Sequence, residues 1–341
     1  MELREFYREK AILVTGGAGS IGSEIVRHVL GYGPKVVRVL DNNETGLFDL
    51  QEELRIHEKN LRIFVGDIRD KERCKRAVED IDVVFHAAAL KHVPLCEYNP
   101  FEAVKTNVIG TQNIIDASIE ENVEKFITIS TDKAVNPINV LGATKLLAER
   151  LTVSANYYRG KKHSVFSCVR FGNVLGSRGS VVITFKDQIK AGGPITLTNK
   201  DMTRFIMSIP EATDLILKAA ELAQGGEVFI LKMPALRILD LAEVMIQELA
   251  PKYGYDPKTM GLAITGTRTG EKLYEELLTE DEIVSTYEKN GIFVMTPTMK
   301  IKDDKCSQKN HSALYKYSSS KVPLLDRAEI KKLLVAMGII K

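Results

Sequence analysis

The sequence of 341 residues has no tryptophan, few cysteines and no long apolar run. No segment approaches the roughly 20 apolar residues of a membrane-spanning helix, and the charged stretch from Met1 to Lys10 is too polar for a signal peptide. Neither metal-ligand nor disulfide spacing connects the cysteines, which are Cys74, Cys96, Cys168 and Cys306. We therefore expect a cytoplasmic protein in a reducing compartment, with no bound metal and no membrane contact.

The sequence also lacks an imbalance of charge, because 47 basic and 45 acidic residues give a formal net charge of +2. The basic residues are scattered, and stretches such as Lys161-Lys162-His163 are typical of a solvated loop rather than a nucleic-acid site. We expect no nucleic-acid partner. The hydrophobic content of 44% is that of a folded protein with one large domain or two of ordinary size.

Short β-branched apolar runs alternate with amphipathic stretches in the first half of the chain. The expected strands are Ala11–Thr15, Val36–Leu40, Arg62–Val65, Val83–His86, Lys125–Ser130 and Val165–Phe171. Strands that are apolar on both faces and separated by helices indicate a parallel sheet covered by helices. Apolar residues at three- and four-residue spacing predict long helices at Pro100–Asn122 and Asn139–Tyr158. The expected fold class is α/β, with a doubly wound parallel sheet of the Rossmann type.

The alternation ends after Phe171, where glycines become frequent. We expect a helix at Val181–Ala191, a strand at Ile195–Thr198, a helix from Pro210, a strand at Val228–Leu231, and a last helix capped by Asp326 and Glu329. Residues 1–172 would form the dinucleotide-binding domain, with 207–239 adding a helix and a strand. Residues 173–206 and 240–341 would form a smaller mixed α/β lobe that binds the substrate.

A glycine-rich segment follows the first strand and opens the first helix. In Thr15-Gly16-Gly17-Ala18-Gly19-Ser20-Ile21-Gly22, the three glycines Gly16, Gly19 and Gly22 form a GxxGxxG pattern. Missing side chains allow a tight turn and a close approach to a pyrophosphate at the positive end of the helix. The pattern predicts a dinucleotide site; a tight turn without a ligand is the alternative.

Asp41 ends the second strand, nineteen residues after Gly22. A carboxylate there can accept hydrogen bonds from the adenosine ribose and would repel a 2′-phosphate. Neither Asn42 nor Asn43 supplies a cation to neutralise it, so NAD is favoured as the cofactor. NADP stays open, because Arg38 or Lys35 could reach the same place.

Two further segments resemble extended short-chain dehydrogenases: Gly66–Asp70 and His86–Ala89. The resemblance implies that Asp67 and Ile68 line the adenine pocket and that Ala87, Ala88 and Ala89 let the cofactor pass. It implies Ser20, Ile21, Asn42, Lys91, Asn107 and Lys145 as further cofactor ligands. His86 has no ligand partner at helical spacing, which favours a packed histidine over a metal ligand.

The fifth strand ends in Thr131-Asp132-Lys133, at the edge where open parallel sheets bind ligands. A hydroxyl, a carboxylate and an ammonium in consecutive positions can supply a donor, an acid and a base. The alternative is a surface Asp–Lys pair beside a turn. The usual tyrosine of the superfamily is missing, because Leu141 stands four residues before the expected active-site Lys145.

These segments resemble the UDP-N-acetylglucosamine 4,6-dehydratases of bacterial capsule and flagellin-glycan pathways. The motifs that carry the resemblance are Thr131–Pro137 with Gly142–Lys145, Ala88–Pro94, Arg170–Ser177 and Gly270–Glu276. The similarity extends from about Tyr7 to Glu280, and it is to the short form without a membrane region. Some relatives carry Met in place of the tyrosine, so an apolar Leu141 has precedent.

The resemblance implies oxidation of the sugar at carbon 4 and loss of water across carbons 5 and 6. Lys133 would be the base at carbon 5 and Asp132 the acid for the leaving hydroxyl, each with a pKa moved toward neutrality. Thr131 would bind the carbon 4 oxygen and Lys145 the nicotinamide ribose. Asp132 or a bound water would replace the tyrosine as the base at the carbon 4 hydroxyl.

The same resemblance implies contacts to a UDP-sugar. Lys91 and Asn173 would lie near the sugar and the pyrophosphate. Val181, Val182 and Thr198 would frame the uracil, and Arg204, Arg268 and Glu271 would bind the nucleotide. Arginine suits a diphosphate because its planar fork meets two oxygens at once; an exposed salt bridge is the alternative for both arginines.

The same residues are compatible with two other functions. A UDP-sugar epimerase or ketoreductase would share the scaffold, but such enzymes mostly use the tyrosine that Leu141 replaces. A regulatory dinucleotide-binding protein without catalysis would explain that loss, but not the presence of Asp132 and Lys133. Retention and inversion at carbon 5 both stay open, as do a 4-keto-6-deoxy product and a 5,6-ene. The family habit is a dimer or higher homo-oligomer through the helices at Pro100–Asn122 and Asn139–Tyr158.

Overall fold

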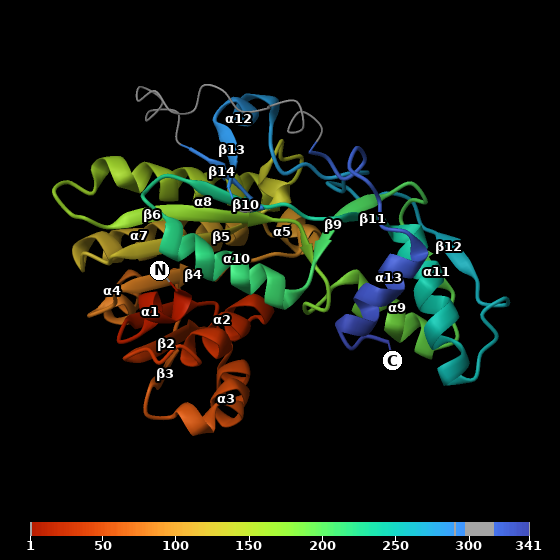
Figure 1. Cartoon of the computed structure of the whole chain (residues 1–341), viewed down its shortest axis with the longest axis horizontal. Helices are drawn as coiled ribbons and strands as arrows, with labels where there is room; N and C mark the ends of the chain where they lie inside the picture. The colour runs from red at the N-terminus through yellow and green to blue at the C-terminus, as the bar shows by residue number, and fades with distance from the viewer. Residues whose placement is uncertain (1, 290, 297–316, 341) are drawn as a thin grey trace.

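A nine-stranded sheet with helices on both faces forms the larger part of the protein (Figure 1). The structure is a computed structural model that describes residues 2–289, 291–296 and 317–340, so Cys306 lies outside the described residues. Seven strands run parallel in the order β3-β2-β1-β4-β5-β6-β10. Their bounds are β1 Ala11–Thr15, β2 Val36–Asp41, β3 Leu61–Val65, β4 Val83–His86, β5 Lys125–Thr131, β6 Val165–Phe171 and β10 Val228–Leu231. The expected doubly wound α/β fold is confirmed, and every expected strand of the first half lies within one residue of its prediction.

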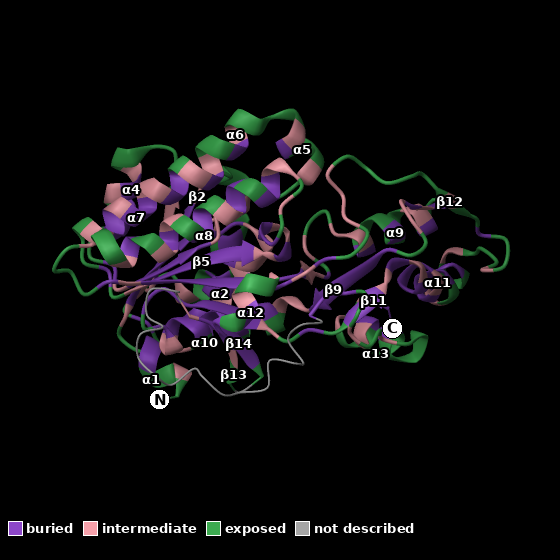
Figure 2. Cartoon of the chain, turned by 90° about the horizontal axis from the view of Figure 1, so that it is seen from above, coloured by how far each residue is buried: buried purple, intermediate pink, exposed green. Residues whose placement is uncertain are grey.

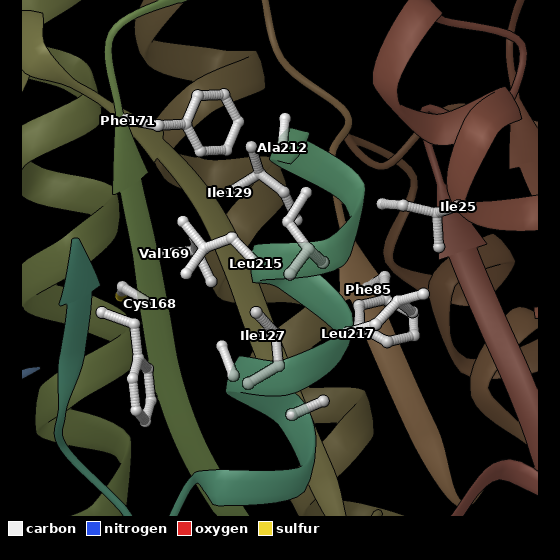
Figure 3. Close-up of a cluster of buried hydrophobic side chains, with 14 of the residues drawn as sticks. Ile25, Phe85, Ile127, Ile129, Cys168, Val169, Phe171, Ala212, Leu215 and Leu217 are labelled. Carbon is white, nitrogen blue, oxygen red and sulfur yellow. The ribbon is translucent and has the colours of Figure 1, made fainter. Parts of the chain in front are cut away.

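Alternate residues of the strands enter two hydrophobic cores, one on each face of the sheet. Ile12 and Val14 of β1 pack in the first core, whereas Ala11 and Leu13 pack in the second. This division follows from the two-residue period of a strand. Figure 3 shows the first core, where Ile25, Phe85 and Ile127 meet Leu215 and Leu217. Both faces of the central strands are therefore covered, as Figure 2 shows by their purple colour.

Helices of both faces follow the expected pattern. The helices of the first core are α1 Leu3–Tyr7, α2 Ser20–Leu30, α3 Glu44–Glu53 and α10 Ile209–Leu222. Those of the second core are α4 Lys71–Val78, α7 Thr111–Glu120 and α8 Val140–Tyr158. The expected continuous helix at Pro100–Asn122 is divided into α6 (Pro100–Val104), a π-helical turn over Lys105–Gly110, and α7. Such turns are rare and occur often beside functional sites.

A smaller lobe encloses a third core. It has a three-stranded sheet, β11-β9-β7, and a two-stranded sheet, β12-β8. Its strands are β7 Asn173–Val174, β8 Ile195–Leu197, β9 Thr203–Met207, β11 Ala235–Arg237 and β12 Leu262–Ile264. Its helices are α9 Val181–Lys190, α11 Ile238–Leu249 and α13 Arg327–Ala336. The expected capping box of the last helix is confirmed, because Asp326 and Glu329 bind each other's backbone N–H.

An antiparallel hairpin extends the main sheet beyond β10. Its strands β13 (Thr286–Lys289) and β14 (Ile292–Met295) follow the short helix α12 (Glu280–Val284). This differs from the expectation that all of 240–341 belongs to the lobe. The apolar run of β14 is buried against β10, which explains its place in the sheet. The other short elements are α5 Val93–Tyr98, η1 Arg55–His57, η3 Asp132–Ala134 and η4 Pro251–Tyr253.

A buried arginine joins this hairpin region to the sheet. Arg170 of β6 is fully buried and donates to the carboxylates of Glu149 on α8 and Glu282 on α12, at 2.7 and 2.8 Å. It also donates to the carbonyl of Leu277 at 3.0 Å. Three elements from distant parts of the sequence are thus held by one guanidinium. Within the described ranges, no helix has the length and apolar character needed to cross a lipid bilayer.

Candidate active site

A cavity of about 830 Å³ opens at the carboxyl ends of the parallel strands, where the strand order reverses between β1 and β4. This is the place at which doubly wound sheets bind ligands. The expected site residues that line it are Gly16, Gly19, Ser20, Ile21, Gly22, Asp41, Asn42, Asp67, Ile68, Ala87, Ala88, Ala89, Lys91, Thr131, Lys133, Lys145, Asn173, Val181 and Arg204. Six others do not line it: Asn107, Asp132, Val182, Thr198, Arg268 and Glu271.

The glycine-rich segment has the shape that a dinucleotide requires. Gly16 has φ +67°, and a Cβ there would lie 2.6 Å from the backbone nitrogen of Ala88. A Cβ on Gly22 would lie 2.2 Å from the carbonyl oxygen of Gly16. Only glycine therefore lets the loop, the start of α2 and the end of β4 pack together. The N-terminus of α2 carries no side-chain cap, which suits a pyrophosphate.

Asp41 is held at the end of β2 by two backbone N–H groups. Ala18 and Asn43 donate to its two carboxylate oxygens, each at 2.9 Å. Arg38 points elsewhere, because its guanidinium donates to the carbonyls of Ala77 and Glu79 and lies over the ring of Phe64. Lys35 does not line the cavity. Neither Arg38 nor Lys35 thus faces the cavity in this structure, which favours NAD over NADP.

His86 is a structural histidine, as expected. It is buried, with Nδ1 2.8 Å from the hydroxyl of Thr15 and Nε2 2.9 Å from that of Thr111. Burial lowers its pKa to about 3, so the ring is neutral near pH 7. The Thr111 hydroxyl donates to the carbonyl of Asn107, so it accepts from Nε2. This chain of hydrogen bonds supports the alanine segment Ala87–Ala89.

Asn107 supports the cavity wall from the π-helical turn instead of entering the cavity. Its side chain exchanges hydrogen bonds with the backbone of Leu90 at 2.8 and 3.1 Å and donates to the Thr144 hydroxyl at 3.0 Å. These bonds use both ends of the amide. In this structure Asn107 fixes the segment that carries Lys91, and a direct contact to the cofactor stays a prediction.

Thr131, Asp132 and Lys133 form one hydrogen-bonded group at the end of β5. Asp132 is fully buried, and its Oδ1 accepts from the Thr131 hydroxyl at 2.8 Å and from the Lys133 ammonium at 2.9 Å. Lys133 also donates to Asn173 at 3.3 Å. The surface-pair alternative is wrong, because the carboxylate lies behind the cavity wall. Asp132 reaches the cavity only through Thr131 and Lys133, which line it.

The charge of Lys133 differs from the sequence expectation. Burial disfavours the ammonium, but the carboxylates of Asp132 and Glu275 outweigh burial, and the pKa of Lys133 is raised. A lysine that acts as a base near neutral pH needs a lowered pKa. Lys133 is therefore a charged donor in the ligand-free protein, and it needs a route for losing a proton before it can act as a base.

Glu275 is the site residue that sequence reasoning missed. It is almost fully buried, and its Oε1 lies 3.7 Å from the Lys133 ammonium. Burial, with the charge of Asp132 second, raises the pKa of this carboxyl. The signal was present in the Gly270–Glu276 motif, but the motif pointed to Glu271 as the ligand. Nothing in the spacing shows that Glu275 turns inward.

Lys145 lies beside the position of the missing tyrosine. Its ammonium donates to the carbonyl of Ile129 at 2.5 Å, and burial lowers its pKa to about 8. Leu141 is buried with Cys96 and Ala103 and lines the cavity with its apolar side chain. No tyrosine contributes to the cavity wall among the described residues. The hydroxyls in this region are instead those of Ser130 and Thr131.

The expected nucleotide ligands divide into two groups. Arg204 is buried, and its guanidinium donates to the carbonyls of Thr203, Lys272 and Leu273, so it holds the Gly270–Glu276 segment as well as lining the cavity. Val182 lies in the core of the lobe, and Thr198 donates to Met202. The side chain of Val182 is packed inside the lobe, and its expected uracil contact stays a prediction. Outside the cavity lie exposed Arg268 and the half-buried Glu271.

The sequence match decides the family. A family model described as polysaccharide biosynthesis protein matches residues 12–297. The chain belongs to this family. The UDP-N-acetylglucosamine 4,6-dehydratase (inverting) of Campylobacter jejuni is 42% identical over 87% of this chain and 86% of that protein. The resemblance inferred from the motifs is thereby confirmed at the level of the family.

Other relatives of this chain carry different names. An uncharacterized membrane protein of Methanocaldococcus jannaschii is 61% identical over 98% of this chain and 97% of that protein. A UDP-glucose 4-epimerase of Rickettsia akari is 35% identical over 98% and 97%. The names alone therefore do not select one reaction.

The fold of this chain is similar to that of two solved structures. Pen from Bacillus thuringiensis is 44% identical and covers 98% of this chain and 100% of its own, with a TM-score of 0.91. DesIV from Streptomyces venezuelae, a dTDP-glucose 4,6-dehydratase solved with NAD bound, is 23% identical over 77% and 86%, with a TM-score of 0.68. The more distant match shows the shared fold alone.

Proposed function

We propose that this protein is a nucleotide-sugar-modifying enzyme, and specifically a 4,6-dehydratase of UDP-N-acetylglucosamine. The observation that carries the proposal is the Thr131–Asp132–Lys133 group, which meets the cavity beside the glycine-rich segment. A carboxylate and an ammonium within hydrogen-bond distance can move protons in opposite directions. The 42% identity to the Campylobacter jejuni dehydratase supports the same reaction.

NAD is the proposed cofactor. Gly16 and Gly22 would hold its pyrophosphate, Asp41 the adenosine ribose, and Lys145 the nicotinamide ribose. Bound there, the nicotinamide would supply hydride chemistry between sugar carbons 4 and 6. The protein's own residues would transfer only protons. The group at the end of β5 determines where these transfers take place.

Thr131 and Asp132 provide a path for the proton of the carbon 4 hydroxyl. The Thr131 hydroxyl can accept that proton while it donates its own to Asp132 Oδ1, 2.8 Å away. Asp132 then carries the proton that the leaving carbon 6 hydroxyl needs to depart as water. The neutral amine of Lys133 would take the proton of carbon 5 and later return it. This route requires no phenol, but it does require that Lys133 first loses the proton that it carries in the ligand-free protein.

The epimerase is the second candidate function, because a UDP-glucose 4-epimerase relative is 35% identical. Leu141 argues against it, since its buried apolar side chain cannot exchange a proton with carbon 4. A dinucleotide-binding protein without catalysis is opposed by the buried Asp132–Lys133 pair, because a buried ion pair costs desolvation that a binding role does not require.

When the protein is incubated with UDP-N-acetylglucosamine and NAD, we expect a product that is lighter than the substrate by one water. Mass spectrometry measures this change. Proton NMR in deuterated water then identifies the ketone or alkene and the configuration at carbon 5. An isomer of unchanged mass would indicate the epimerase instead. Unchanged substrate in the presence of bound dinucleotide would favour the non-catalytic binder.

The cofactor preference is expected to depend on Asp41. Replacing it with alanine should weaken NAD binding by about tenfold, because two hydrogen bonds to the ribose are worth roughly 1–1.5 kcal/mol. NADP binding should improve or stay constant, since a negative charge is removed. Isothermal titration with both cofactors measures this, and Asp49→Ala on exposed α3 is the matched control. Equal losses for NAD and NADP would contradict the assigned role.

A homo-oligomer is part of the same proposal. Exposed Leu95 and Tyr98 on α5 and Phe101 on α6 provide an apolar surface near the expected helices. Such a cluster is typical of a surface that another protein covers. Residues 1–172 with 207–239, together with the β13–β14 hairpin, form the proposed dinucleotide-binding part, and the lobe forms the substrate-binding part.

A further inference from the structure

Glu275 lies beside Lys133, with its Oε1 3.7 Å from the ammonium. It follows the Gly270 turn and is 2% exposed, and its carboxylate does not line the cavity. Its backbone exchanges hydrogen bonds with Ser319, whose hydroxyl accepts from the Glu275 N–H and whose N–H donates to the Glu275 carbonyl, both at 2.9 Å. A segment from the far end of the chain thus fixes the position of this carboxylate.

Two buried carboxylates share the single ammonium of Lys133. Asp132 Oδ1 lies 2.9 Å from it and Glu275 Oε1 lies 3.7 Å from it. The second oxygen of each carboxylate, Asp132 Oδ2 and Glu275 Oε2, is buried and has no hydrogen-bond partner among the described residues. Leaving such atoms unpaired costs roughly 1–3 kcal/mol each or more. The cost is reduced when one of the carboxylates takes up a proton.

Other charged groups around Glu275 do not satisfy it. Arg204 on β9 lies 4.0 Å from Oε1, but its guanidinium donates to three backbone carbonyls. The Lys272 ammonium donates to the carbonyl of Val135. Glu271 lies 3.9 Å from Arg204 and adds a like charge nearby. Glu275 is therefore left with Lys133 as its nearest exchangeable proton.

We propose that Glu275 accepts the proton of Lys133 during the reaction, so that the Lys133 amine becomes the base at carbon 5. This inference rests on the proposed dehydratase function. Once Asp132 has taken the carbon 4 proton, the ammonium loses its nearest counter-charge. A buried ammonium and carboxylate at 3.7 Å then neutralise each other when one proton moves from Nζ to Oε1.

Every protonated group returns to its starting state after one turnover. The N–H bond of Lys133 breaks as the O–H bond of Glu275 forms, and the neutral amine then takes the proton of carbon 5. Lys133 returns that proton to carbon 5 after water has left. Glu275 finally returns its own proton to Lys133. The raised pKa of Glu275, caused by burial and then by Asp132, agrees with a carboxyl that can hold a proton. Because Glu275 acts through Lys133, it is a positioning residue.

The test is Glu275→Gln, which keeps the shape of the side chain but removes the proton acceptor. We expect the turnover number to fall about 10²-fold, at the low end of general acid–base effects, with KM and NAD affinity unchanged. Deuterium exchange at carbon 5 should fall by the same factor in deuterated water. Glu275→Asp should restore part of the rate, and Glu276→Gln, whose carboxylate contacts Asn136, is the matched control.

Thermal unfolding without ligand gives a second measurement. Because the folded-state pKa of Glu275 is raised above its ordinary value of 4.5, its contribution to stability is present below that pH and is lost as the pH rises through the raised value. The stability of wild type relative to Glu275→Gln should therefore decrease with rising pH. A difference that does not change with pH would overturn the proposal.

The outcomes are distinct. Wild type that leaves UDP-N-acetylglucosamine unchanged refutes the proposed dehydratase and this role of Glu275 with it. Wild type that releases water while Glu275→Gln matches its rate refutes the role of Glu275 alone. A variant that loses carbon 5 exchange and NAD affinity together has a structural defect at this position, which also contradicts the proposal.

Discussion

Replacing Lys133 with methionine is expected to reduce dehydration about 10³-fold, because a proton transfer by a positioned side chain contributes roughly 10²–10⁴. Asp132→Asn should cause a loss of similar size, since the amide keeps the hydrogen bond from Thr131 but cannot carry a proton. NAD affinity should stay constant in both variants, because neither side chain belongs to the proposed cofactor contacts. Stopped-time assays of product mass measure the rates, and titration with NAD measures the affinity.

A surface lysine provides the control for this prediction. Lys232 is exposed, pairs with Glu288 at 3.3 Å and does not line the cavity, so Lys232→Met removes a comparable charge without touching the group at the end of β5. Its turnover should equal that of the wild type. Near-normal rates for both Lys133→Met and Asp132→Asn would remove these two residues from the reaction and leave the family resemblance without a chemical basis in this chain.

Replacing Arg170 with methionine is expected to lower the free energy of unfolding by about 3–5 kcal/mol. The substitution keeps much of the buried volume but leaves the carboxylates of Glu149 and Glu282 without their counter-charge. It also removes the donor to the Leu277 carbonyl, two residues beyond Glu275. Denaturant unfolding, followed by circular dichroism, gives the loss from the shift in midpoint at constant slope.

The control for this prediction is an exposed ion pair with the same chemistry. Arg27 binds Glu53 at 2.6 Å at the surface, and exposed pairs contribute roughly 0–1 kcal/mol. Arg27→Met should therefore lower the unfolding free energy by less than about 1 kcal/mol. Equal losses of unfolding free energy in the two variants would mean that the burial of Arg170 adds nothing to stability, which would contradict this prediction.

The strands and the glycine-rich turn after β1 could be predicted because local rules determine them. Short β-branched apolar runs set the ends of β1, β4, β6 and β10, which match the predictions at both ends. The single wrong boundary of a long helix lies at the π-helical turn, where an extra residue per turn cannot be inferred from three- and four-residue spacing.

Side-chain direction could not be predicted in the same way. Arg38 and Asn107 have the right chemistry and the right place in the sequence for cofactor ligands, yet both bind backbone carbonyls or amides instead. Their partners, Ala77, Glu79 and Leu90, are distant in the sequence. A residue that can donate to either a ligand or the protein takes the partner that folding places nearer.

The amino-acid sequence alone determined the doubly wound sheet, the glycine-rich turn after β1 and the pairing of Asp132 with Lys133, since each depends on neighbours along one strand or one turn. Only the tertiary structure decided that Lys133 is charged. Glu275 approaches Lys133 because Arg204 and Ser319 hold its segment against the end of β5. The electrostatic environment of a buried group depends on such distant contacts, and spacing in the chain does not encode them.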